Sequence, residues 1–300
     1  MKNVSARVCA YVCLATLTFA SPASAELIYG VAAVSNATAL VAWDSASPSD
    51  LVSSMFVTGL QPNETILGID FRLATAPGQL YALGSSSRLY TVNVATGAAS
   101  QVPAPGGPYI PALNGFTYGF SFIPNNDTIR SVAETNANFR LNPTTGARTI
   151  DADLFYAAGD PNANVDPNAV HAAHTPGFLT PGAAQLYVID SGLNTLATGG
   201  LAPGELNTVG ALGFDVDGAG GFDVSGLTGT AYAALLPATS SVSQFYSINL
   251  ATGAATSLGV IDGGLVITAM AVGPAIPEPA TLGLLCVGIV GCLVARRRIG

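Results

Sequence analysis

A short motif that recurs at nearly even intervals is the feature that most constrains how this chain folds. The pattern N-x-x-T-G occurs at residues 93–97, 142–146 and 249–253, so its copies lie 49 and then 107 residues apart. These separations are one and about two units of a repeat of roughly fifty residues. Alternating apolar residues precede each copy and a short second run follows, which predicts a β-hairpin with a bulged turn. Glycine suits the bulge because it adopts a positive φ at little cost.

Two further sets of short strands recur with the same period. The strands expected to open each repeat begin with glycine or alanine, and they span residues 68–71, 119–122, 172–175, 221–224 and 269–272. The strands expected next span residues 27–30, 79–83, 128–132, 185–189 and 230–234. Units of about fifty residues that each hold four short strands are typical of the blades of a β-propeller.

The two ends of this repeat pattern complement each other. The last opening strand, residues 269–272, has no unit after it, and the first unit, residues 27–59, lacks an opening strand. We therefore expect an all-β fold, a β-propeller of five four-stranded blades, in which residues 269–272 supply the innermost strand of the first blade. This closure would remove open sheet edges. A β-sandwich and an irregular β-solenoid are the alternatives, and both are also all-β because the body shows no helical period.

Residues 1–25 have the organisation of a secretory signal peptide. Lys2 and Arg7 precede an apolar run, residues 8–20, and small residues ending in Ala23-Ser24-Ala25 follow it. We expect cleavage before Glu26. The alternative is an uncleaved anchor helix, but the apolar run is short and no stop-transfer pattern follows it.

Residues 276–300 form a second targeting segment. The motif Pro277-Glu278-Pro279 leads into sixteen residues without a charge, Ala280–Ala295, and then into Arg296-Arg297-Arg298. As a helix the uncharged run would extend about 24 Å, somewhat less than the ~30 Å hydrocarbon core, so we expect a transmembrane helix there. The terminal arginines should stay on the cytoplasmic side, which leaves the body, residues 26–275, outside.

This tail resembles the PEP-CTERM sorting signal, which combines a Pro-Glu-Pro motif, a short membrane span and an arginine-rich end. In that family an exosortase-type membrane enzyme recognises the tail and is thought to remove it, in bacteria that make extracellular polysaccharide. The resemblance therefore implies anchoring in the inner membrane, followed by location at the cell surface or outside the cell. The chemistry at Pro277–Pro279 would be done to this protein and not by it.

The body resembles an uncharacterised family of secreted bacterial proteins, a domain of unknown function that is often found with this tail. The likeness extends over nearly all of residues 27–273 and rests on residues 68–72, 79–84, 140–146, 156–162 and 190–192. It implies a propeller-like repeat fold and export, and it transfers no catalytic residue.

The composition of the body excludes several classes of partner. All four cysteines lie in the two targeting segments, so the body cannot form a disulfide. It has no lysine, and its 17 acidic residues and five arginines give a net charge of −12. This charge argues against nucleic acid or anionic lipid as a partner and favours cations or neutral surfaces.

The body also lacks the motifs of common catalytic sites. It has no cysteine nucleophile, no G-x-S-x-G turn, no phosphate-binding G-x-x-x-x-G-K-[ST] loop and no lysine for a Schiff base. Its two histidines, His171 and His174, should point to opposite faces of one strand, so we expect two separate structural histidines with satisfied polar atoms. The sequence therefore predicts neither an enzyme nor a cofactor.

A candidate ligand site comes from the third positions of the predicted opening strands. These positions hold, in order, Asp70, Ser121, His174, Asp223 and Ala271. In a propeller they would surround one end of the axis, and converging polar groups in a concavity indicate a ligand site. The alternative is that these groups satisfy backbone atoms at a crowded axis. For Arg72, Arg130 and Arg140 we expect structural ion pairs with the abundant acids.

A second candidate site is a calcium loop at Asp160, Asn162, Asn164 and Asp166, whose oxygen side chains alternate along the chain. The match to an EF-hand loop is incomplete, because Val165 stands where glycine is needed and His171 where glutamate is needed. Clusters of Asp, Asn and Pro also form ordinary turns, and we favour a turn here.

Two classes of function follow from these observations. The preferred one is a noncatalytic binding or structural protein, exported and displayed through its tail, that meets extracellular polysaccharide, a surface protein or a cation. The alternative is a hydrolase or lyase acting on extracellular polysaccharide with Asp70 and Asp223 as its acids. A glycosidase of this kind needs its two carboxyl groups ~5–9.5 Å apart.

Overall fold

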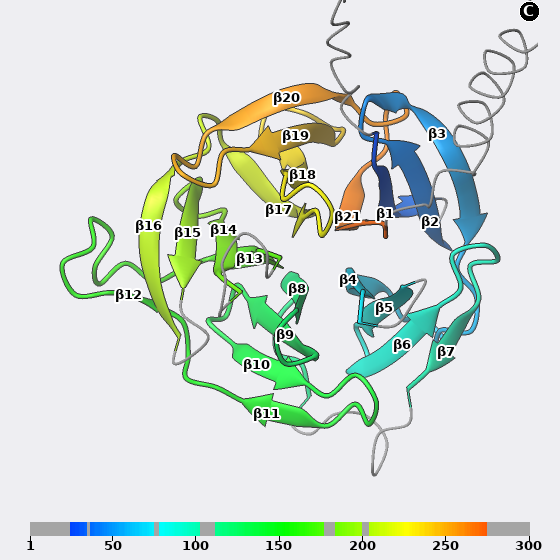
Figure 1. Ribbon diagram of the computed structural model, residues 1–300, viewed down its shortest axis with the longest axis horizontal. Coiled ribbons are helices and arrows are strands. Elements are labelled where there is room, and N and C mark those ends of the chain that lie inside the picture. Colours follow the sequence, from blue (N-terminus) through cyan, green and yellow to red (C-terminus); the bar gives the residue numbers. More distant parts are fainter. Residues whose placement is uncertain are drawn as a thin grey trace, which may run out of the picture.

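The computed structural model describes residues 25–34, 37–74, 78–102, 112–176, 184–199 and 204–274. Five sheets stand around a central axis in the manner of propeller blades (Figure 1). The structure therefore confirms the all-β, five-bladed propeller. The predicted sorting tail and all but the last residue of the predicted signal peptide lie outside the described residues.

Within the described ranges, no helix is long and apolar enough to cross a membrane.

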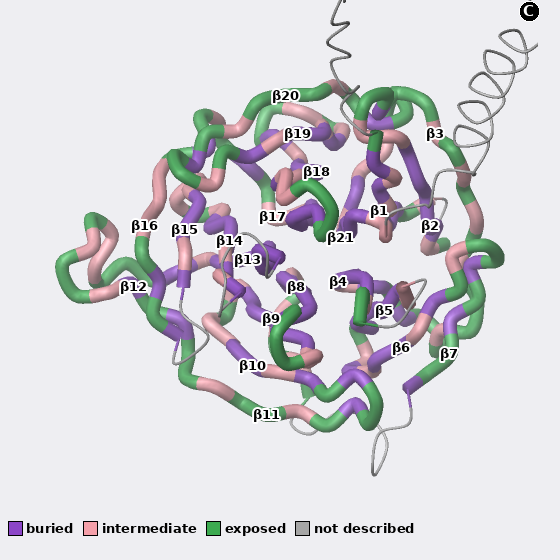
Figure 2. Tube along the Cα trace, in the orientation of Figure 1, coloured by how far each residue is buried: buried purple, intermediate pink, exposed green. Residues whose placement is uncertain are grey.

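Each blade presents one strand to the axis, and these five inner strands contact one another in a ring. The inner strands are β4 (Ile66–Arg72), β8 (Tyr118–Ile123), β13 (Ala169–His174), β17 (Val216–Val224) and β21 (Ile267–Val272). Figure 2 shows that buried residues concentrate on these strands, whereas the outer strands carry most of the exposed ones. Every residue of β8 and of β13 is buried.

The remaining strands follow outward from the axis in antiparallel order. They are β1 (Leu27–Val34), β2 (Ala37–Asp44), β3 (Ser47–Phe56), β5 (Gln79–Gly84), β6 (Arg88–Val92), β7 (Ala99–Gln101), β9 (Thr128–Ala133), β10 (Asn138–Leu141), β11 (Arg148–Ile150), β14 (Leu186–Asp190), β15 (Thr195–Gly199), β16 (Glu205–Ala211), β18 (Ala231–Pro237), β19 (Gln244–Ile248) and β20 (Ala255–Val260). Four blades have four strands each, as predicted.

The fourth blade has a fifth strand that the sequence pattern did not predict. Strand β12 (Phe155–Tyr156) pairs in parallel with β16 at the outer edge of this blade. Gly204 allows the approach, since its φ is 109° and a Cβ atom there would lie 2.3 Å from the carbonyl oxygen of Asp153. The segment that connects the third blade to the fourth is therefore hydrogen-bonded to the outer strand of the fourth blade. The repeat pattern does not predict this contact, because it depends on how neighbouring blades are placed.

The ring closes between the two ends of the body. Strand β21 pairs with β1 in a register that joins Ile28 to Val272 and Val31 to Ala269. This is the closure predicted from the unmatched strands at the ends of the repeat. The blade that begins the chain is thus completed by the strand that ends the body, so opening the ring would break a whole strand ladder.

The N-x-x-T-G motifs form the predicted turns between the two outer strands of three blades. In the first copy, the Gly97 N–H donates to the Asn93 carbonyl oxygen at 2.8 Å, and Asn93 Oδ1 accepts from Ala95 N–H at 2.9 Å. The glycines that end the three motifs, at 97, 146 and 253, have φ values of 72°, 71° and 80°. Asparagine and glycine are both needed, because one closes the turn with its side chain and the other adopts the left-handed backbone.

Apolar side chains fill the gaps between neighbouring blades. Trp43 on β2 is fully buried and meets Phe245 on β19 edge-on, with 5.6 Å between ring centroids. Tyr81 on β5 meets Phe122 on β8 in the same way at 5.3 Å. Such aromatic pairs join blades that no strand ladder connects.

The narrow axis depends on residues without a large side chain. Gly119 lies so close to the next inner strand that a Cβ atom would come within 2.5 Å of Ala172 N, and for Gly68 the nearest atom is Phe120 Cβ at 2.4 Å. In the other three blades the equivalent positions are Gly221, Ala172 and Ala269. The glycine and alanine that open each inner strand in the sequence therefore let the strands meet at the axis.

We expect Gly221→Ala to destabilise the propeller. A Cβ atom at Gly221 would lie 2.2 Å from Met270 N, and backbone atoms of a closed ring have little room to retreat. Overpacking of this kind costs ~1–3 kcal/mol or more, which thermal unfolding followed by circular dichroism would detect as a lower Tm. The control is Gly264→Ala, where the nearest atom is a methyl carbon of Val242 at 3.8 Å. An equal Tm for both variants would contradict this account of the axis.

Candidate functional site

Two cavities lie at opposite ends of the axis, each lined by one end of the inner strands. The first residues of the inner strands, such as Ile66, Tyr118 and Thr268, line a cavity of about 340 Å³. The last residues, such as Phe71 and Val272, line a cavity of about 280 Å³. Between them the glycine and alanine positions leave almost no free space. The axis is therefore closed in the middle and hollow at each end.

The smaller cavity contains all four residues of the predicted ligand ring. Asp70, Ser121, His174 and Asp223 come from four different blades and line this cavity together. We call it the acid cavity. The fifth ring position, Ala271, is fully buried, and its neighbour Val272 lines the cavity instead. The repeat register thus correctly predicted that these side chains share one end of the axis.

The two aspartates of the acid cavity also connect neighbouring blades. Asp70 accepts from the N–H of Phe71 with one oxygen and from the N–H of Phe122, on the next inner strand, with the other, both at 2.6 Å. Asp223 accepts in the same way from the residue that follows it and from Val272 N–H, both at 2.7 Å. Each carboxylate therefore satisfies backbone donors on two blades, as the structural alternative for this ring predicted.

Burial makes both aspartates of the acid cavity weaker acids than an exposed aspartate. Burial raises the pKa of Asp70 well above its usual value, and the charge of Asp223 raises it further. Burial raises the pKa of Asp223 to about 7, although the N–H donors of Val272 and Val224 oppose this rise. Two such groups at one end of a closed axis resist full ionisation.

His174 adds a neutral group to the acid cavity. Burial and the positive charge of Arg130 lower the pKa of His174 to about 3, so the imidazole is uncharged at neutral pH. Its Nδ1 lies 3.1 Å from Ser121 Oγ, which also accepts from the His174 backbone N–H at 3.1 Å. The Nε2 atom is buried and has no hydrogen-bond partner among the described residues.

The second histidine belongs to the other end of the axis. His171 lines the larger cavity, and its Nε2 is likewise buried without a partner in the described part of the chain. Burial lowers the pKa of His171 to about 4. The expectation that the two histidines do not share a site is confirmed. The expectation that their polar atoms are satisfied is wrong for both Nε2 atoms.

The predicted ion pairs of the arginines are confirmed. Arg72 holds Asp127 at the rim of the acid cavity, with 2.8 Å between Nε and the nearer carboxylate oxygen. Arg130 and Arg140 both pair with Asp151, at 3.3 and 2.7 Å. These arginines therefore hold acids in place within the propeller.

The predicted calcium loop lies between β12 and β13 and projects from the outer edge of its blade (Figure 1). Asp160 accepts from Thr208 N–H at 2.6 Å and from its hydroxyl at 2.7 Å. Asn162 also contacts the Thr208 hydroxyl, at 2.9 Å, whereas Asp166 accepts from the Asn136 side chain at 2.6 Å.

The backbone of the same loop makes successive turns. One of its residues, Asn164, has a φ of 69°. Nowhere in the described ranges do three or more His, Cys, Asp or Glu side chains group so as to hold a metal ion. The calcium site stays a prediction.

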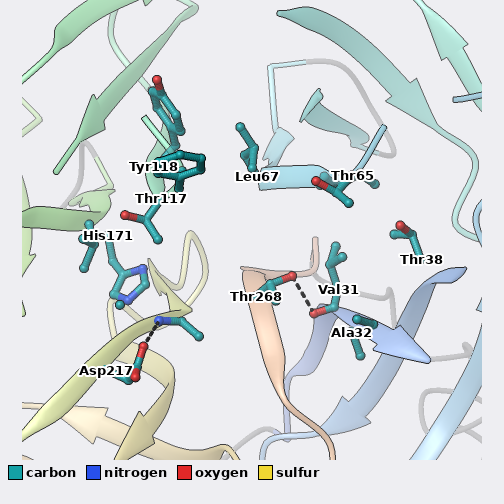
Figure 3. Close-up of a pocket in the computed structure, with 16 residues that line it drawn as sticks. Val31, Ala32, Thr38, Thr65, Leu67, Thr117, Tyr118, His171, Asp217 and Thr268 are labelled. Atoms are coloured by element: carbon teal, nitrogen blue, oxygen red, sulfur yellow. Dashed lines mark hydrogen bonds between the residues drawn. The ribbon is translucent and has the colours of Figure 1, made fainter. Parts of the chain in front are cut away.

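The larger cavity was not anticipated from the sequence. Figure 3 shows Thr117, Tyr118 and His171 on one side of it and Thr38, Thr65 and Leu67 on the other, with Thr268 and Val31 between them. We call it the threonine cavity. Two of its threonines, Thr65 and Thr117, stand directly before inner strands. A polar residue at that point of the repeat is the signal that could have indicated this site.

Comparison with family models matches residues 39–271 to the Domain of unknown function (DUF4394). This protein belongs to the DUF4394 family. Residues 275–298 of this DUF4394 protein match the PEP-CTERM protein-sorting motif. It is therefore an exported PEP-CTERM protein that carries a propeller domain, as the resemblances of body and tail implied.

No curated protein matches this DUF4394 chain. Solved structures similar to it include a chain of a nidogen/laminin complex, with 9% identity, a TM-score of 0.47 and coverage of 83% of this chain and 98% of the other. A structural genomics protein of unknown function from Bacteroides thetaiotaomicron VPI-5482 shows 16% identity, a TM-score of 0.45 and coverage of 78% and 57%. Hydrazine synthase from Kuenenia stuttgartiensis shows 14% identity, a TM-score of 0.41 and coverage of 68% and 51%.

We expect Asp223→Asn to remove a pH-dependent loss of stability. The folded-state pKa of about 7 lies above the ordinary value of 3.8, so the stability that protonated Asp223 contributes is complete below the unfolded pKa and is lost as the pH rises through 7. Thermal unfolding of the full chain should show the Tm of Asp223→Asn gaining at least ~2 °C on the wild type between about pH 5 and about pH 8.

Asp262→Asn is the matched control for this experiment, because it removes one negative charge from an exposed turn. Its Tm should follow that of the wild type across the same pH range. If the curves of Asp223→Asn and the wild type stay parallel, the buried aspartate does not titrate as described.

Proposed function

We propose that this protein is a noncatalytic binding module, displayed at the cell surface through its PEP-CTERM tail, and that its acid cavity binds a small organic cation. The proposal rests on one observation above all. Four blades place Asp70, Ser121, His174 and Asp223 in a single cavity, so that two buried carboxyls stand beside a neutral imidazole, while the third carboxylate of the lining, Asp127, is paired with Arg72.

The hydrogen bonds of the cavity leave acceptors and few donors for a ligand. Ser121 Oγ donates to the Phe122 carbonyl oxygen at 3.4 Å, so the His174 Nδ1–H donates to Ser121 and Nε2 is left as an acceptor. Both aspartate carboxylates are acceptors when ionised. An ammonium group has only donors to offer, and it would also relieve the repulsion between the two carboxylates.

The walls of the acid cavity indicate that the cation carries an apolar portion. Leu73, Ile123, Pro124, Pro176 and Val272 surround the polar groups. The domain charge of −12 attracts cations from solution and repels polyanions. A primary or substituted amine with a small hydrocarbon body fits both properties.

The same geometry counts against the hydrolase or lyase alternative. A general acid must present its proton to the substrate, and a nucleophile or base must present a free oxygen. Both oxygens of Asp70 and both of Asp223 are occupied by backbone N–H groups that belong to two different blades. Moving either carboxylate toward a substrate would leave buried donors unpaired.

The tail supports the cellular part of the proposal. The sorting motif at 275–298 implies recognition by an exosortase-type enzyme. We propose that the chain is first held in the inner membrane by residues 280–295 and is then released to the cell surface or the extracellular matrix. There the exposed loops and outer strands of the propeller are free to meet polysaccharide or a surface protein.

Amine binding can be tested by thermal unfolding and calorimetric titration of the full chain, purified in detergent, with a panel of small primary amines. Benzylamine and its neutral analogue benzyl alcohol form a matched pair of probes. The amine should raise the Tm and the alcohol should not, because a ligand bound only to the folded state stabilises it. The rise should be smaller in Asp223→Asn and in His174→Phe, and unchanged in Asp262→Asn.

Two results would overturn the proposal. The first is a panel in which no amine raises the Tm, or in which the neutral alcohol raises it equally. The second is release of reducing sugar ends from an extracellular polysaccharide by the wild type but not by Asp223→Asn, which would support the hydrolase.

A further inference from the structure

We infer that the threonine cavity, at the opposite end of the axis from the acid cavity, is a binding site for neutral carbohydrate. Its volume of about 340 Å³ lies within the ~300–1,000 Å³ of small-molecule sites. Three kinds of group line it, and each matches one feature of a sugar: hydroxyl groups, an exposed aromatic ring and a buried imidazole nitrogen without a partner.

Hydroxyl groups come into this cavity from several blades. The threonines that line it are Thr38, Thr65, Thr117 and Thr268. Figure 3 shows these four side chains distributed around the cavity. A hydroxyl group both donates and accepts hydrogen bonds, as the hydroxyl groups of a sugar do. The hydroxyl groups of Thr117 and Thr268 already donate to Glu134 and to the Val31 carbonyl oxygen, so they can accept from a ligand, whereas Thr38 and Thr65 can also donate. Groups of both kinds can therefore contact several positions of one polyhydroxylated ligand.

An exposed phenylalanine stands at the same cavity. Phe116 is 91% exposed and lines the cavity two residues before β8 begins. Because most of this ring stays in water, a ligand that covers it would gain the free energy of burying apolar surface. The flat apolar face of a phenyl ring suits the C–H face of a pyranose.

The segment that carries Phe116 is held in place by hydrogen bonds. The Phe116 N–H donates to one oxygen of Glu134 at 2.6 Å, and the Thr117 N–H and hydroxyl donate to the other at 3.1 and 2.9 Å. The N–H of Gly115 donates to the Tyr118 hydroxyl at 2.8 Å. Burial alone would raise the pKa of Glu134, but these hydrogen bonds lower it, so the carboxylate stays ionised and keeps the segment fixed.

His171 supplies the third feature. The side chain is 3% exposed, lines the cavity and carries an Nε2 atom without a hydrogen-bond partner in the described structure. Buried polar atoms almost always have a hydrogen-bond partner, so a ligand hydroxyl at this end of the axis would supply the partner that His171 Nε2 lacks. Burial also keeps the ring neutral, which suits an uncharged ligand.

The charge of the site restricts the carbohydrate to neutral ones. None of the residues that line the threonine cavity is lysine or arginine, and Asp217 contributes a carboxylate to it. The Asp217 carboxylate accepts from Ala219 N–H at 3.3 Å. A uronic acid or a sulfated sugar would meet only negative charge here, both from Asp217 and from the domain as a whole.

This inference does not depend on amine binding in the acid cavity, because the two cavities lie at opposite ends of a closed axis. The test is an array of neutral and acidic oligosaccharides probed with the labelled full chain in a detergent without sugar groups. We expect binding to neutral glycans and none to the acidic ones. Phe116→Ala should weaken the binding about tenfold, which corresponds to a loss of about 1.4 kcal/mol and lies within the range that aromatic stacking contributes.

Matched variants distinguish the threonine cavity from the acid cavity, and a loss of glycan binding from a loss of folding. Phe56→Ala removes another exposed phenyl ring, on outer strand β3, and should leave glycan binding unchanged. Thr65→Val keeps the shape of the side chain, removes one hydroxyl group and should weaken binding, whereas His174→Phe at the acid cavity should not. Unfolding curves of each variant show whether it is folded. Absence of binding to every neutral glycan, or equal binding by Phe116→Ala and Phe56→Ala, would overturn the inference.

Discussion

Close contact between five inner strands at the axis is the constraint on which the rest of this propeller depends. Gly68, Gly119 and Gly221 leave no space for even a methyl group against the next strand, and Ala172 and Ala269 take the same position in the other blades. Strands that meet so closely seal the middle of the axis. The side chains at the two ends of these strands line a cavity at each end of the axis, where residues far apart in the sequence lie together.

Buried carboxylates need hydrogen-bond donors, and at the sealed axis the backbone of neighbouring blades supplies them to the aspartates of the acid cavity. Asp70 and Asp223 join neighbouring blades through backbone N–H groups, and the same carboxyls line the cavity. Their burial raises their pKa values, and each carboxylate oxygen accepts a backbone N–H. This geometry is the basis of our proposal that the acid cavity binds a cation and does not act as a catalyst.

The two ends of the axis differ in chemistry because the inner strands begin and finish with different residues. One end gathers acids and a histidine whose Nδ1 is paired to Ser121, and the other gathers hydroxyl groups and the exposed ring of Phe116. This difference is the reason why we propose a different ligand for each end of the axis. The sorting tail at 275–298 supplies the route to that surface.

The number of blades, the bulged turns and the closure of the ring follow from the repeat pattern alone, because each depends on local periodicity or on a glycine with positive φ, as at Gly97. The same register brought Asp70 and Asp223 to one end of the axis. Only the tertiary structure decided that these carboxylates bind the backbone of the next blade, that His174 Nε2 is left unpaired and that β12 joins the fourth blade. Those contacts depend on how neighbouring blades are placed, which no single repeat encodes.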